Sequence, residues 1–183
     1  MHRLTTFAVV VVLAAGLGAC GKHGAKNVYT CPNQGPGVGF NSVKSGKLTV
    51  DTALPAPLWW VGDNNDTLTG GFEFELAKGL CADLGIKRVR IVNVDRKNLL
   101  AGRTSDFDLA LAQIVNTGQS GVVLSTPYFT AGDGRKYSAL LPKGSVNNQL
   151  VNTAITKLEK NGTLASLAKK WFKGAATPAT VAP

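Results

Sequence analysis

Histidine and cysteine are scarce in this chain of 183 residues, which holds 2 histidines and 3 cysteines. Three cysteines are too few for a disulfide-built scaffold or a four-ligand zinc site. The histidines, His2 and His23, both stand near the beginning of the sequence, away from the segments that look globular. Nucleophilic hydrolysis assisted by a histidine base is therefore not expected.

Acidic residues are few as well, 11 against 20 lysines and arginines. We predict that four of them form a solvent-exposed set rather than a catalytic pair, because of strand alternation and helix position: Glu73, Glu75, Asp106 and Asp108. The segment Asp63 to Asp66 resembles part of a calcium loop, but the glycine and glutamate that such a loop requires are missing at their offsets. We expect no enzyme activity, no cofactor and no metal.

Long apolar runs are also absent. The longest, Phe7 to Leu17, is well short of the ~20 residues that span a bilayer, and it follows a short basic start. It predicts a signal peptide over residues 1–19. Leu17 to Cys20 (LGAC) resembles the lipobox of bacterial lipoproteins, which predicts lipid on Cys20 and a location on the outer face of the cell membrane; an ordinary signal peptide is the alternative. Export makes nucleic acid an unexpected partner despite the net charge of +9.

The remaining sequence divides into three parts. Residues 20–44 lack periodicity and predict a tether, residues 45–173 predict one globular domain, and residues 174–183 predict a disordered tail. Cys31 and Cys81 could form one disulfide in an oxidising compartment, or they could remain two thiols, and their spacing does not decide between these.

The globular part begins with alternating strand and helix patterns. Apolar segments at 48–53, 89–94 and 109–114 predict strands, and the stripe from Leu76 to Leu84 predicts a helix. Asp133-Gly134 between two apolar runs predicts a hairpin, and two amphipathic helices follow at 150–158 and 164–172. The order predicts an α/β fold with a mixed open sheet and flanking helices.

Several segments, in order, resemble the family 3 extracellular solute-binding proteins, which are the amino-acid receptors of ABC importers. They are Gly71 to Lys78 (GFEFELAK), Leu100 to Ala110, Leu124 to Phe129 (LSTPYF), Leu141 to Ser145 and Asn152 to Trp171. Complete members have two lobes. Here only Thr130 to Lys136 stands where the second lobe is inserted, so the resemblance implies a single flavodoxin-like lobe of a type 2 periplasmic binding protein.

The resemblance also implies candidate ligand-binding residues. Asp51 matches an acidic position that faces the ligand's ammonium group, and Trp59 and Trp60 match aromatics that cover the ligand. The loop after the third strand supplies Gln113, Asn116 and Thr117, but it lacks the arginine with which relatives bind a carboxylate. Structural roles are the alternative: a strand end or helix cap for Asp51, and loop packing for the tryptophans.

The sequence therefore predicts a lipid-anchored solute-binding protein that binds a polar small molecule such as an amino acid weakly, with an ABC permease as a further partner. The alternative is a surface interaction protein. In that case the former cleft face, with Trp59 and Trp60 as an exposed apolar patch, binds a protein or an envelope polymer.

Overall fold

The computed structural model describes residues 27–117, 122–173 and 176–177. In this part of the chain seven strands form one sheet in the order β1-β3-β2-β4-β6-β5-β7. The strands are β1 (Val28–Thr30), β2 (Lys47–Thr52), β3 (Arg88–Asn93), β4 (Leu109–Val115), β5 (Val123–Ala131), β6 (Lys136–Leu141) and β7 (Ala176–Thr177). The helices are α1 (Phe72–Asp83), α2 (Arg96–Leu100), α3 (Asn148–Lys160) and α4 (Thr163–Phe172).

The sheet is mixed, which confirms the predicted fold class. Strands β2, β3 and β4 are parallel, as expected for strands joined through helices. Strand β6 lies antiparallel to both β4 and β5. The predicted hairpin is present, since β5 leads into β6 through the turn around Asp133 and Gly134, where the N–H of Gly134 donates to Ala131 O. A long strand pair therefore occupies the position at which two-lobed relatives cross to their second lobe.

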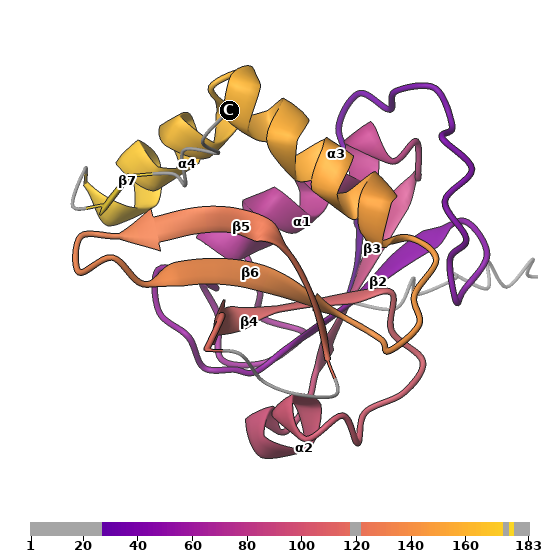
Figure 1. Cartoon of the computed structure of the whole chain (residues 1–183), viewed down its shortest axis with the longest axis horizontal. Coiled ribbons are helices and arrows are strands. Elements are labelled where there is room, and N and C mark those ends of the chain that lie inside the picture. The colour runs from indigo at the N-terminus through magenta and orange to yellow at the C-terminus, as the bar shows by residue number, and fades with distance from the viewer. Residues whose placement is uncertain (1–26, 118–121, 174–175, 178–183) are drawn as a thin grey trace, which may run out of the picture.

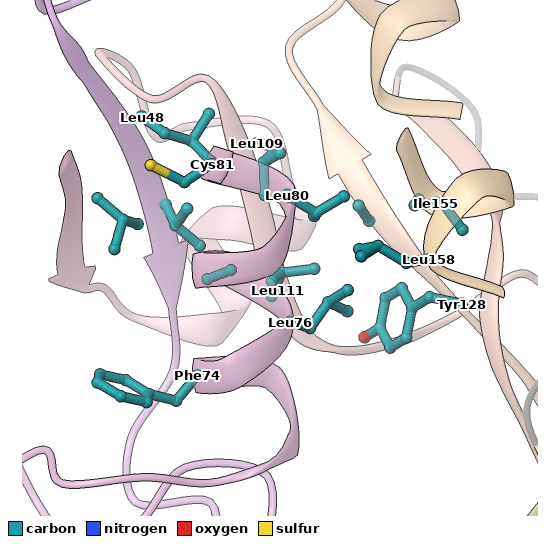
Figure 2. Close-up of a cluster of buried hydrophobic side chains, with 14 of the residues drawn as sticks. Leu48, Phe74, Leu76, Leu80, Cys81, Leu109, Leu111, Tyr128, Ile155 and Leu158 are labelled. Atoms are coloured by element: carbon teal, nitrogen blue, oxygen red, sulfur yellow. The ribbon is translucent and has the colours of Figure 1, made fainter. Parts of the chain in front are cut away.

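Helices cover both faces of the sheet, with α1, α3 and α4 on one side and α2 on the other (Figure 1). The larger core lies under the three helices. Figure 2 shows Leu76 and Leu80 of α1 gathered with Leu111 of β4 and Leu158 of α3, and all four side chains are buried. The smaller core lies under α2, where Leu99 packs with Ala110, Ala112 and Leu140. Burial of these apolar faces is what holds the helices to the sheet.

The start of α1 depends on close backbone packing. Gly71 has φ 118°, and a Cβ there would lie 2.3 Å from the Trp59 carbonyl oxygen, so only glycine fits. The first helical N–H groups, of Phe72 and Glu73, donate to the carbonyls of Leu58 and Trp59. These groups, which would otherwise lack partners at a helix start, are therefore satisfied within the chain.

The described part of the predicted tether, residues 27–44, is packed on the lobe. Strand β1 pairs with β3, and Cys31 forms a disulfide with Cys81 of α1. Farther along, Asn41 exchanges two backbone–side-chain hydrogen bonds with Asn147. Non-local pairing of this kind leaves no trace in local periodicity. The predicted signal peptide, Cys20 and residues 174–175 and 178–183 of the predicted tail lie outside the described residues.

Candidate functional site

The carboxyl ends of β2, β3 and β4 meet at one edge of the sheet, which we call the carboxyl edge. The connection from β2 to α1, the start of α2 and residues 116–117 after β4 all lie there because the three strands are parallel. The β5–β6 hairpin reaches the same edge, since β6 runs antiparallel to β4 and begins opposite the end of β4. In open α/β sheets, ligands bind at this edge.

A buried carboxylate, that of Glu73, lies at the centre of the carboxyl edge. Its Oε2 accepts hydrogen bonds from Trp60 Nε1 at 2.7 Å and from the side-chain amide of Gln113. Its Oε1 accepts from the Gln113 backbone N–H at 2.9 Å and from the Tyr128 hydroxyl. Four donors from the β2–α1 connection, β4 and β5 thus converge on one side chain, which is fully buried.

Burial raises the pKa of Glu73, while the hydrogen bonds from Tyr128, Gln113 and Trp60 oppose that rise. The indole N–H of Trp60 and the backbone N–H of Gln113 can donate a hydrogen bond but cannot accept one. Each carboxylate oxygen of Glu73 therefore has at least one partner that is solely a donor. This arrangement suits the ionised carboxylate. Burial and the neighbouring Glu73 charge also raise the pKa of Tyr128.

The prediction that the four acidic residues are solvent-exposed is wrong for two of them. Glu73 is buried as described, and Asp108 is 2% exposed. The Asp108 carboxylate accepts from the backbone N–H groups of Val43 and Thr49, both at 2.7 Å, and so ties the loop before β4 to β2. The periodicity of α1 contained a signal for Glu73, because residue 73 shares a helix face with Ala77 and Leu80.

Trp59 and Trp60, the expected ligand-covering aromatics, take part in packing. Trp60 is only 1% exposed and donates to Glu73. Trp59 is half-buried in a ring cluster, with centroids 4.9 Å from both Tyr137 and Phe172. Its cluster belongs to the core on the α1 side of the sheet. The exposed apolar patch expected from the two tryptophans is therefore absent, because core packing covers Trp60 and half-covers Trp59.

Gln113 and Arg96 determine the backbone geometry at the end of β4. Gln113 has φ 50°, and its side chain and N–H both point to Glu73. Arg96, the first residue of α2, donates from its guanidinium to the carbonyls of Ala112 and Gln113, the latter at 3.0 Å. The loop after β4 has no arginine, yet α2 brings one to the same strand end. Arg96 was not predicted as a site residue, because nothing in its local sequence pattern relates it to β4.

Asn116 lines a pocket of about 400 Å³ between the end of β4 and the β5–β6 hairpin. The hairpin side of this pocket contains Asp133, Arg135 and Lys136. The Asn116 N–H donates to the Lys136 carbonyl at 3.2 Å, and Asp133 forms an ion pair with Arg135 at 2.7 Å. Thr117 follows Asn116 directly. We call this cavity the hairpin pocket; its polar lining suits a small polar solute.

Asp51 lies apart from the two tryptophans. In the sheet it pairs with Val92 of β3 and Ala110 of β4, and Ala110 belongs to the core under α2. Its side chain therefore faces the α2 side, whereas Trp59 and Trp60 pack on the α1 side. Burial raises the pKa of Asp51 to about 7, against an opposing effect of Arg90. The structure therefore brings Trp60 and Gln113 together at Glu73 but places Asp51 on the other face of the sheet.

Within residues 27–117, 122–173 and 176–177, no group of three or more histidine, cysteine, aspartate or glutamate residues is placed to hold a metal ion. In those same ranges, no helix combines the length and apolar character needed to cross a bilayer.

The fold and the carboxyl edge define a class: an α/β lobe of the kind that builds type 2 periplasmic binding proteins. The family of bacterial extracellular solute-binding proteins, family 3, matches residues 48–174. The chain belongs to this family, as the sequence resemblance indicated. A comparison with curated proteins finds no match.

Solved structures of amino-acid-binding proteins have the same fold. The arginine-bound form of domain 1 from TmArgBP is 26% identical, with a TM-score of 0.54 over 62% of this chain and 94% of that chain. An ancestral arginine-binding protein bound to arginine is 19% identical, with a TM-score of 0.61 over 70% and 99%. An ancestral amino acid-binding protein, described as a precursor of cyclohexadienyl dehydratase, is 18% identical, with a TM-score of 0.60 over 69% and 95%.

Proposed function

We propose that this protein is an exported, lipid-anchored, single-lobe solute-binding protein that holds a small polar solute, such as an amino acid, at its carboxyl edge. The proposed anchor is Cys20, the proposed lobe extends to residue 173, and the proposed role is binding rather than catalysis. An ABC permease is the proposed downstream partner.

One observation carries the proposal: domain 1 of TmArgBP, a single domain of which this chain covers 94%, is described as arginine-bound. A lobe of this fold thus needs no second lobe to hold an amino acid. An open lobe leaves one side of the solute in water, so we expect millimolar affinity, or about 4 kcal/mol, where a closed two-lobed cleft reaches micromolar affinity.

The hairpin pocket is the proposed position of the solute. Asn116 supplies a polar group to it, and Lys136 adds a positive charge suited to a carboxylate. Thr117, the next residue along the chain, is a proposed further contact. Trp60 and Gln113 act in this proposal as positioning residues, because their donors are directed to Glu73. Trp59 holds the β2–α1 connection against the aromatic cluster.

The test is an NMR titration of the ¹⁵N-labelled protein with L-arginine, L-glutamine and the other standard amino acids up to about 20 mM. We expect millimolar binding of at least one, with shifts at the amides of Asn116 and Gly134. Lys136→Gln weakens that binding, and Lys160→Gln, on the exposed face of α3, leaves it unchanged. Absence of shifts for every amino acid contradicts the proposal, and micromolar binding by the monomer contradicts its weak-affinity part.

The same samples test the alternative of a surface interaction protein. A dimer held through the hairpin face, with no response to any amino acid, would favour that alternative. Incorporation of labelled palmitate in a bacterial host, lost in Cys20→Ser, tests the lipid anchor separately from solute binding.

A further inference from the structure

A second pocket, of about 420 Å³, opens on the α2 side of the sheet. Asp51 of β2 and Arg90 of β3 line it from the sheet, over a floor that includes Val92. Thr104 and Asp106 line it from the connection between α2 and β4, and Lys44 lines it from the segment before β2. We call this cavity the Asp51 pocket. None of its lining residues is shared with the hairpin pocket.

Two buried polar groups of this pocket have no hydrogen-bond partner among the described residues. They are Oδ2 of Asp51, whose residue is 2% exposed, and Oγ1 of Thr104. A buried carboxylate oxygen without a donor is costly, and natural proteins keep few such groups. By contrast, each carboxylate oxygen of Asp108, which lies on the same connection as Thr104, accepts a hydrogen bond from a backbone N–H group. In the Asp51 pocket, Asp51 Oδ2 therefore lacks a hydrogen-bond donor that a ligand could supply.

The charges that line the pocket have both signs. Asp51 and Asp106 are acidic, and Arg90 and Lys44 are basic. A simple amine would meet Asp51 but also two like charges, and a simple carboxylate would meet Arg90 but also two acidic groups. A molecule that carries an ammonium and a carboxylate fits both halves.

We propose that the Asp51 pocket is a second solute site, which takes a small zwitterion with its ammonium group on Asp51 and its carboxylate on Arg90 and Lys44. Thr104 supplies a hydroxyl to either end of the ligand. This proposal does not depend on the hairpin pocket, because the two cavities have separate walls and different charged groups.

Ionisation of Asp51 makes the proposed site pH-dependent. Burial raises the pKa of this carboxyl to about 7, with Arg90 opposing the rise, and Lys44 and Asp106 are the other charged groups that line the pocket. An ammonium group needs the ionised form. The ionised fraction grows from about 3% at pH 5.5 to about 90% at pH 8, so affinity rises about 30-fold over that interval.

The test is an NMR titration with three zwitterions of increasing length: glycine, β-alanine and γ-aminobutyrate. Propylamine and propionate are the one-sided controls. We expect at least one zwitterion to shift the amides of Val92 and Thr104, more tightly than either control and more tightly at pH 8 than at pH 5.5. Equal binding of propylamine, a response independent of pH, or no shifts at these amides overturns the proposal.

Variants separate this site from the protein's stability and from the hairpin pocket. Arg90→Gln should weaken zwitterion binding at least fivefold, whereas Arg88→Gln, on the same strand but outside the pocket lining, should leave it unchanged. Asp51→Asn should abolish zwitterion binding. If the Asp51 variant does not fold, Arg90→Gln still tests the proposal. Equal binding by the Arg90 and Arg88 variants overturns the proposal. Shifts at Asn116 instead of Val92 report the hairpin pocket, so the two proposals succeed or fail independently.

Discussion

Replacement of Glu73 by glutamine tests the central hydrogen-bond network of the carboxyl edge. The substitution keeps the size of the side chain and replaces one acceptor oxygen with an NH₂ group. In one orientation that NH₂ faces Trp60 Nε1, and in the other it faces the Gln113 backbone N–H. Neither partner can become an acceptor, so each orientation leaves one fixed buried donor unpaired.

The size of the effect follows from these contacts. An unpaired buried donor costs about 1–3 kcal/mol, and hydrogen bonds to a charged acceptor are stronger than neutral ones by roughly 1 kcal/mol each. Removal of the buried charge offsets part of this loss of stability, because a neutral amide is easier to desolvate than a carboxylate. We expect Glu73→Gln to lower the free energy of unfolding by about 3 kcal/mol, or Tm by roughly 6–12 °C for a domain of this size.

Urea unfolding followed by circular dichroism measures this difference. Tyr128→Phe is the matched comparison: it removes one donor without leaving another unpaired, and should cost about 1 kcal/mol. Glu75→Gln, which loses only an exposed pair with Lys170, should change stability by less than about 1 kcal/mol. If Glu73→Gln is as stable as the wild type, Glu73 is protonated in the native state and the reasoning from its four donors fails.

Two further predictions concern the N-terminal segment and Asp51. The Cys31–Cys81 disulfide closes a separation of 50 residues, so the double variant Cys31→Ser/Cys81→Ser should lose up to about 4 kcal/mol in urea unfolding, and dithiothreitol should destabilise only the wild type. Because the pKa of Asp51 is about 7 in the folded protein and about 4 unfolded, the native state binds more protons between these values, and wild-type stability falls as pH rises through that interval. Asp51→Asn cannot ionise, so its stability relative to wild type should rise by at most about 4 kcal/mol from pH 4 to pH 8; an unchanged difference would contradict the raised pKa.

The carboxyl edge shows where prediction from sequence succeeds and where it stops. Strands β2 to β6, helices α1, α3 and α4 and the Asp133-Gly134 hairpin were predictable, because each is encoded by periodicity or turn residues within about ten positions. Strands β1 and β7 were not, since they lie in segments predicted as tether and tail. The role of Glu73 was missed, although its place in the α1 stripe was visible, because its partners Gln113 and Tyr128 are 40 and 55 residues away. Arg96 was missed for the same reason, because the carbonyls that it contacts lie 16 and 17 residues farther along the chain.

The sequence by itself determined that the chain is an α/β lobe of family 3 type, with seven residues where relatives insert a second lobe. These features are local or ordered along the chain, and apolar periodicity and turn chemistry specify them directly. Only the tertiary structure decided which side chains share a site. Strand alternation directs Asp51 to the α2 face, core packing covers Trp60, and the return of β6 between β4 and β5 builds the hairpin pocket. The physical reason is that burial and hydrogen-bond satisfaction depend on contacts across the sheet, and a residue's chain neighbours do not contain that information.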